Sequence, residues 1–190
     1  MPFGLLTPAS WVALFTRRYM HLTGCTQDAL FEIAQATRDY AVRNPAAFFY
    51  QRPMTRADYD AGKKICNPLT LYDCCQESDG GCAIVVTTPE RARHLKQPGV
   101  SIRGVAQCIA KDQEEMTSFY RPDIARIPEM DLAADEAYAQ CGLSAQDIDA
   151  AVIYDAFTPI VLWQLESWGF CKYGEAADFV QAGNLRPNGR

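Results

Sequence analysis

The chain has 190 residues, of which 48% are hydrophobic and 22% charged, as in an ordinary globular protein. Its formal net charge of −5, with no run of basic residues, argues against a nucleic-acid-binding surface. No apolar stretch approaches the roughly 20 residues that span a bilayer, and the N-terminus lacks the basic region of a secretory signal. We therefore expect a soluble protein with one core or two small ones.

The eight cysteines indicate free thiols rather than a disulfide framework. The chain is long enough to form an apolar core without cross-links, and most cysteines stand among apolar residues, where a thiol behaves as a small hydrophobic group. This usage predicts a reducing compartment, most simply the cytoplasm. There is no Cys-x-x-Cys pair and His21 and His94 are the only histidines, so we expect no metal site. The cysteines are Cys25, Cys66, Cys74, Cys75, Cys82, Cys108, Cys141 and Cys171.

Two helices are predicted in the first 44 residues. Thr7 followed by proline is a helix-start pattern, and Gly24 ends the helix that it begins. The second helix is predicted from Thr26 to Arg43, with Thr26 as its cap, and Asn44-Pro45 ends it.

The stretch Asn44–Asp60 is irregular and rich in aromatic residues. It could cover a ligand site, or it could be a loop packed on its own domain, which is the commoner role of aromatic clusters. Within it, the spacing of Thr55 and Asp58 predicts the start of a short helix.

A turn and a buried strand are predicted next. Ser78–Gly81 has turn composition, and the apolar run Cys82–Thr88 has the pattern of a buried strand. The adjacent glycines do not make a phosphate-binding loop, because such loops lead from a strand into a helix. We therefore assign Asp79-Gly80-Gly81 a structural role.

The middle of the chain contains the predicted domain boundary. A short helix begins at Pro89, and His94 is expected to be a solvated residue beside basic neighbours. Gln97-Pro98-Gly99 separates residues 1–97 from residues 98–190. After it, Val100–Ala106 alternates as a strand does.

One further helix precedes the most informative segment. Lys111–Met130 is predicted to be an irregular loop, and Asp131–Cys141 a helix that Gly142 ends. Ser144–Asp147 has the composition of a capping turn.

The segment Asp147–Gly169 predicts a strand, a polar turn and a helix. Ala151–Ile153 is a short apolar run typical of a buried strand. Thr158 and Pro159 form a helix-start pattern in which the threonine hydroxyl caps the helix. The turn between them contains Tyr154, Asp155 and Phe157. In open α/β sheets ligands meet the protein at such turns, so a tyrosine and an aspartate facing a helix N-terminus could bind and polarise an oxygen atom.

This segment resembles the thiolase superfamily. The turn reads Tyr154-Asp155-Ala156-Phe157, where ordinary thiolases have Asn-Glu-Ala-Phe and sterol-carrier-type thiolases have His-Asp-x-Phe. It is most similar to the bacterial lipid-transfer-protein branch, often labelled acetyl-CoA acetyltransferase, which includes retro-aldolases of steroid side-chain CoA thioesters. Two further matches are the Pro-Leu, Asp-Cys-Cys and Ser-Asp-Gly pattern over residues 68–80, and Gly-Leu followed by Asp-Ile-Asp over residues 142–149.

The resemblance implies an α/β, thiolase-like fold with αβαβα layers, of which this chain would be a part. Residues 1–97 would be the tail of the N-terminal half, including the loop region that covers acyl-CoA, and residues 98–190 the start of the C-terminal half. The family's nucleophilic cysteine and its histidine-bearing, glycine-rich loops have no counterpart here. We therefore expect an internal fragment of a longer enzyme that is inactive on its own.

The resemblance also implies a function. We expect carbon–carbon bond cleavage or acyl transfer on a lipid or steroid acyl-CoA thioester, with Tyr154 as general acid or base and with Asp155 and Phe157 in contact with the substrate. Tyr154 could instead be a tyrosine packed at a strand end, and Asp155 a turn and cap residue. No cofactor is expected beyond the coenzyme A of the substrate. The branch implies a homodimer and a small OB-fold partner protein. The alternative is a non-catalytic carrier of acyl-CoA or lipid with the same fold.

Overall fold

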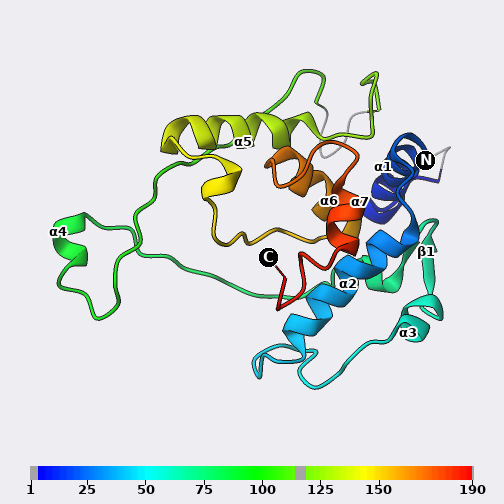
Figure 1. The fold of residues 1–190 in the computed structure, drawn as a ribbon, viewed down its shortest axis with the longest axis horizontal. Coiled ribbons are helices and arrows are strands. Elements are labelled where there is room, and N and C mark those ends of the chain that lie inside the picture. Colours follow the sequence, from blue (N-terminus) through cyan, green and yellow to red (C-terminus); the bar gives the residue numbers. More distant parts are fainter. Residues whose placement is uncertain (1–3, 114–118, 190) are drawn as a thin grey trace.

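The computed structural model describes residues 4–113 and 119–189, and its regular secondary structure is mostly helical (Figure 1). Its elements, in chain order, are α1 (Pro8–Thr23), α2 (Gln27–Ala41), α3 (Arg56–Asp60), β1 (Lys64–Cys66), β2 (Leu69–Thr70), the 3₁₀ turn η1 (Leu71–Asp73), α4 (Pro89–Ala92), α5 (Pro128–Cys141), the 3₁₀ turn η2 (Ala145–Asp147), α6 (Thr158–Ser167) and α7 (Ala176–Gln181). No helix in the described ranges has the length and apolar character needed to cross a membrane.

The helices begin where local capping signals predicted them. The Thr7 side chain accepts a hydrogen bond from the Ser10 amide at the start of α1, and Gly24 ends that helix in the left-handed conformation, with φ of 75°. Thr26 caps α2 in the same way. Thr55 caps α3. Among the predicted helix starts, the one that differs clearly is that of α5, which begins at Pro128 rather than at residue 131 because the proline occupies its first turn.

The main core joins the two ends of the chain. Helices α1 and α2 precede the long middle section and α6 and α7 follow it, yet α2 contacts both α6 and α7 (Figure 1). Tyr19, Leu30 and Leu162 are fully buried in this core. Burial of a leucine side chain stabilises a fold by about 1.5–3 kcal/mol, so these contacts hold the two ends together.

The three predicted strands, of which residues 82–88 and 151–153 were expected to be buried, are not strands in this structure, and those predictions were wrong. Residues 82–88, 100–106 and 151–153 run as extended chain without a sheet partner. Val85 is 88% exposed, Val100 is 92% exposed and Val152 is fully exposed. Within residues 4–113 and 119–189 the only sheet is the antiparallel pair β1–β2. An apolar extended segment forms a sheet strand only when a second strand pairs with its backbone.

One of these extended segments lies against α5. The Gln140 side chain accepts a hydrogen bond from the Val105 amide at 2.9 Å and donates one to the Val105 carbonyl at 3.0 Å. Gly104 approaches so closely that a Cβ atom there would lie 2.7 Å from the Ala137 carbonyl oxygen. This segment therefore contacts α5 on one side, and Val105 is still 67% exposed. His94, as predicted, is exposed.

Candidate functional site

The turn Tyr154–Phe157 lies between an extended segment and the N-terminus of α6. The helix is formed as predicted, from Thr158 to Ser167. Tyr154 as a residue is 72% exposed, so it is open to solvent rather than sealed among packed side chains. An exposed phenol near a helix N-terminus is available to donate a hydrogen bond to a ligand oxygen.

Two hydrogen bonds hold the first half of this turn. The side-chain amide of Gln164, in α6, donates a hydrogen bond to the Tyr154 carbonyl oxygen at 2.7 Å. The Thr37 hydroxyl of α2 donates to Asp155 Oδ2 at 3.3 Å. The turn is thus fixed both to its own helix and to α2.

The second half of the turn pairs with the Asp-Cys-Cys motif. The Cys75 amide donates to the Ala156 carbonyl oxygen at 2.9 Å, and Cys74 and Phe157 form an isolated antiparallel bridge. The two segments that carried the family resemblance, more than 80 residues apart, therefore lie side by side. This pairing gives the Asp-Cys-Cys motif a definite structural role.

Thr158 does not act as the predicted cap of α6. Phe157 occupies the cap position and no side chain caps the helix there. The Thr158 hydroxyl instead donates to Asp73 Oδ1 at 2.8 Å. Asp73 is 1% exposed and was not predicted as a site residue. Its position three residues after Thr70, the spacing of a capping box, is the sequence signal that could have drawn attention to it.

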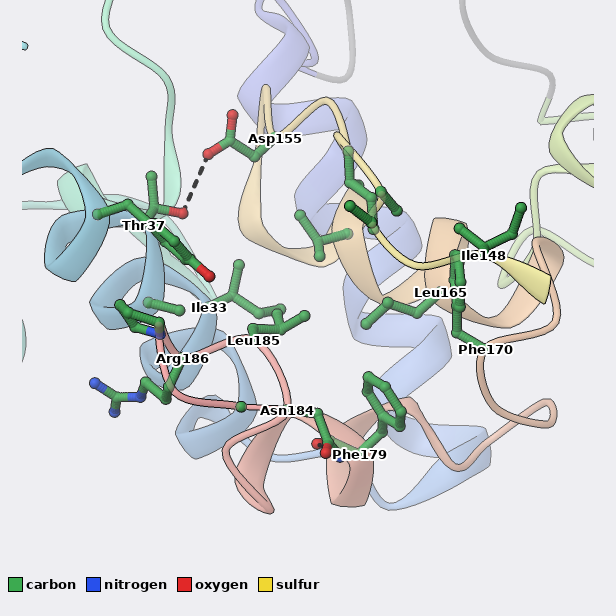
Figure 2. A pocket seen from close by; sticks show the side chains of 18 of the residues that line it. Ile33, Thr37, Ile148, Asp155, Leu165, Phe170, Phe179, Asn184, Leu185 and Arg186 are labelled. Carbon is green, nitrogen blue, oxygen red and sulfur yellow. Dashed lines mark hydrogen bonds between the residues drawn. The ribbon is translucent and has the colours of Figure 1, made fainter. Parts of the chain in front are cut away.

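Asp155 and Thr37 line both of two cavities. The first has a volume of about 530 Å³ and an apolar lining that includes Ile33, Leu165 and Phe170. Figure 2 shows it bounded by α2, the extended chain at Ile148 and the segment that contains Leu185, with the Thr37–Asp155 hydrogen bond at one side.

The second cavity has a volume of about 540 Å³ and lies on the side of the Asp-Cys-Cys motif. Arg38 lines it, with its guanidinium carbon 3.8 Å from the centre of the Phe49 ring. Among the described side chains no carboxylate forms an ion pair with Arg38. Burial lowers the pKa of this guanidinium, but arginine remains charged at neutral pH. Phe49 belongs to the aromatic stretch Asn44–Asp60, so this stretch forms part of the wall of the second cavity.

The three predicted site residues are not gathered in one cavity. Asp155 lines both cavities, whereas Tyr154 and Phe157 line neither. Phe157 is half-buried and packs against the main core. Cys74 lines the second cavity. Burial, followed by the nearby Asp73 carboxylate, raises the pKa of its thiol to about 11, so it is not a thiolate nucleophile at neutral pH. Within the described ranges, no group of three or more His, Cys, Asp or Glu side chains could hold a metal ion.

Comparison with known proteins identifies the fold. Residues 110–190 match the family model described as thiolase C-terminal domain-like. The chain is 54% identical over 190 residues to a steroid side-chain-cleaving aldolase of Thermomonospora curvata, covering all of this chain and 49% of that protein. It is 48% identical over 189 residues to a 17-hydroxy-3-oxo-4-pregnene-20-carboxyl-CoA lyase of Mycobacterium tuberculosis, again over 49% of that protein.

A solved structure agrees closely with this one. The structure described as the Ltp2-ChsH2(DUF35) aldolase superposes with a TM-score of 0.95 at 54% identity, over 99% of this chain and 49% of that chain. The predicted thiolase-like fold is confirmed. The chain spans about half the length of these relatives, and its extended segments follow the backbone course of a protein twice as long.

Proposed function

We propose that this chain, whose residues 110–190 match the thiolase C-terminal domain-like family, is part of an enzyme that cleaves a carbon–carbon bond in an acyl-CoA thioester by a retro-aldol reaction. The aldolase and the CoA lyase to which it is similar support a steroid or other bulky acyl group. The observation that carries the proposal is the exposed phenol of Tyr154, on a backbone that Gln164 fixes at the N-terminus of α6.

The reaction requires a proton to leave a β-hydroxyl group and another to reach the product. A base removes the hydroxyl proton, a carbonyl group forms at the β-carbon, and the bond between the α- and β-carbons breaks. Its electron pair enters the thioester as an enolate, which then takes a proton to give the shortened acyl-CoA. A phenol with a pKa near 10 is a donor at neutral pH and becomes a base only if its pKa is lowered. Tyr154 fits either proton transfer as general acid or base.

The neighbours of Tyr154 take supporting roles. Asp155 lines both cavities and is held by Thr37, which supports contact with the substrate. Phe157 packs against the core, so its contribution to substrate binding is through the position of the turn. A tyrosine in place of the asparagine or histidine of thiolases favours cleavage over Claisen condensation and acyl transfer.

The proposal includes what the whole protein requires. Coenzyme A enters as part of the substrate, and no other cofactor takes part. The name of the structural relative joins two proteins, Ltp2 and ChsH2(DUF35), which supports a partner protein here. The proposal takes this partner to be the small OB-fold protein that the resemblance implies. A homodimer and a cytoplasmic location complete the proposal.

The test uses a chimera, because this chain spans about half of its relatives. This chain replaces the equivalent half of the Thermomonospora curvata aldolase, and cleavage of a β-hydroxy steroid acyl-CoA is followed by chromatography. Tyr154→Phe should lower kcat about 10²- to 10⁴-fold, the contribution of a positioned proton donor, with substrate affinity retained. The control is Tyr120→Phe, since Tyr120 is 78% exposed and lines neither cavity.

A carrier function makes a different prediction. If the chimera and its Tyr154→Phe variant bind the acyl-CoA equally and neither cleaves it, the chain belongs to a non-catalytic acyl-CoA or lipid carrier.

A further inference from the structure

The part of the chain that the structure describes contains three capping boxes of the same local geometry. Each consists of a Thr or Ser and an Asp three residues later, whose Oδ2 atom accepts from both the amide and the hydroxyl of the first residue. The distances are 2.8 and 2.7 Å for Thr55 and Asp58, 2.7 and 2.9 Å for Thr70 and Asp73, and 2.8 and 2.7 Å for Ser144 and Asp147.

Asp73 differs from the other two aspartates in its surroundings. Asp58 and Asp147 are exposed, whereas Asp73 is 1% exposed. Its Oδ1 atom accepts from the Tyr59 hydroxyl and from the Thr158 hydroxyl, each at 2.8 Å. A buried carboxylate needs such donors to offset the loss of hydration. A local helix cap requires neither of these long-range partners.

From this difference we propose that Asp73 is a positioning residue for the Tyr154–Phe157 turn, acting through Thr158. The inference rests on the proposed function of Tyr154. Asp73 fixes Thr158 at one end of a short paired segment in which Cys74 bridges Phe157 and the Cys75 amide binds the Ala156 carbonyl.

The same carboxylate connects the turn with the loop region before it. Tyr59 is fully buried at the end of α3, and burial, followed by Asp73, raises the pKa of its phenol, so that it remains a hydrogen-bond donor. Asp73 therefore joins α3, η1 and the start of α6 at one point. A displacement of about 1 Å in a reacting group can cost about 10²-fold in rate, so a shift at this point affects Tyr154 through the paired backbone.

The variants separate positioning from simple stabilisation. Asp73→Asn replaces one acceptor oxygen by a donor that faces the hydroxyl and amide donors around it. Thr158→Val removes a single hydrogen bond and leaves Asp73 in place, and Thr158→Ser keeps the hydroxyl. Asp147→Asn is the matched control, because it changes a capping box whose hydrogen bonds, from the Ser144 amide and hydroxyl, do not reach the turn.

Two readouts are taken. In the chain itself, ring-labelled tyrosine NMR reports the Tyr154 resonance, and hydrogen exchange reports the Cys75 amide. In the chimera described above, kcat and KM are measured separately. Asp73→Asn and Thr158→Val should shift the resonance, speed exchange, and lower kcat about 10- to 100-fold with KM changed less than about threefold. Thr158→Ser and Asp147→Asn should match the unaltered protein in every readout.

The NMR and hydrogen-exchange results can contradict the positioning role of Asp73 even if the retro-aldol reaction is not observed. If Asp73→Asn lowers the melting temperature but both the Tyr154 resonance and kcat stay unchanged, Asp73 only stabilises the fold. If Asp73→Asn does not fold, the same comparison of melting temperature, Tyr154 resonance and kcat is made with Thr158→Val. If the unaltered chimera is inactive, the proposed function fails, whereas the resonance and exchange measurements still decide whether Asp73 positions the turn.

Discussion

The guanidinium of Arg186 lies 2.6 Å from the Asp39 carboxylate, although the two residues are 147 positions apart in the chain. A second nitrogen of the same guanidinium lies 2.6 Å from Glu32. Both carboxylates are on α2, and Arg186 also lines the first cavity. The last described segment of the chain is thus fastened to α2 and forms part of the wall of that cavity (Figure 2).

Replacement of Arg186 should destabilise the fold. Arg186→Met keeps the length of the side chain but leaves two half-buried carboxylates without their partner. The free energy of unfolding should fall by about 1–3 kcal/mol, between the values for exposed and buried ion pairs. Urea titration followed by circular dichroism measures this change. The control Arg56→Met also breaks two ion pairs, but they are exposed, and its cost should stay below about 1 kcal/mol. Equal costs for the two variants would contradict the prediction.

The cysteines should react in two groups. Cys75 and Cys82 are exposed and should be modified by a disulfide reagent within minutes at pH 8. Cys25 is buried, and burial together with Glu166 raises the pKa of its thiol to about 12. The thiolate is the reactive form, so Cys25 should react only after unfolding. Mass spectrometry of the modified peptides identifies each site. Early labelling of Cys25 would show that the packing around it is open.

The extended apolar segments should cause self-association. Unpaired extended backbone with exposed apolar side chains is a template for pairing with another chain. The chain on its own should bind a hydrophobic dye and form larger species as its concentration rises, measured by fluorescence and light scattering. Lysine in place of Val85, Val100 and Val152 should reduce both effects, with stability changed by less than about 0.5 kcal/mol per site because these side chains are exposed.

A core substitution is the control for the lysine variants. Leu162 is fully buried, so Leu162→Ala should lower the free energy of unfolding by about 2–5 kcal/mol. Lysine variants that unfold the chain as Leu162→Ala does would show that the three valines are packed rather than exposed.

Stability should depend on pH through Glu166. Its Oε1 atom accepts hydrogen bonds from the Tyr19 hydroxyl at 2.5 Å and from the Gly174 amide at 2.8 Å. Burial nevertheless raises the pKa of this carboxyl. The stability contributed by the protonated form is therefore fully present below the unfolded pKa of about 4.3 and is lost as pH rises through the higher folded value. Glu166→Gln keeps an acceptor oxygen and should remove this dependence.

Thermal melts of the two proteins from pH 4 upward measure the effect. As pH rises, the melting temperature of Glu166→Gln should increase relative to that of the unaltered chain. A constant difference over this range would show that ionisation of Glu166 is not coupled to folding.

The helices could be predicted from the sequence because their signals are local. Thr7, Thr26 and Thr55 each cap a helix that begins within one residue of the predicted start. The strands could not be predicted in the same way. The apolar runs are extended, but a strand also depends on a partner whose identity a single segment does not contain.

The same difference between local signals and contacts with distant residues applies to the candidate site. The turn at Tyr154 and the helix after it were visible in the sequence, and both are formed. The role of Thr158 was not, because a threonine before a proline has the same pattern whether its hydroxyl caps the helix or reaches a distant acid. Asp73 was missed as a site residue since only the folded chain brings it to Thr158.

The arrangement of the core has a consequence for cleavage of the chain. Helices α1 and α2 stand on one side of residues 76–113 in the sequence, and α6 and α7 on the other, yet these helices share a single interior. A protease that cuts at the exposed Arg91 or Arg93 would produce two pieces, each with an apolar helix face that only the other piece can cover. The nicked molecule should elute as one species until denaturant separates its halves.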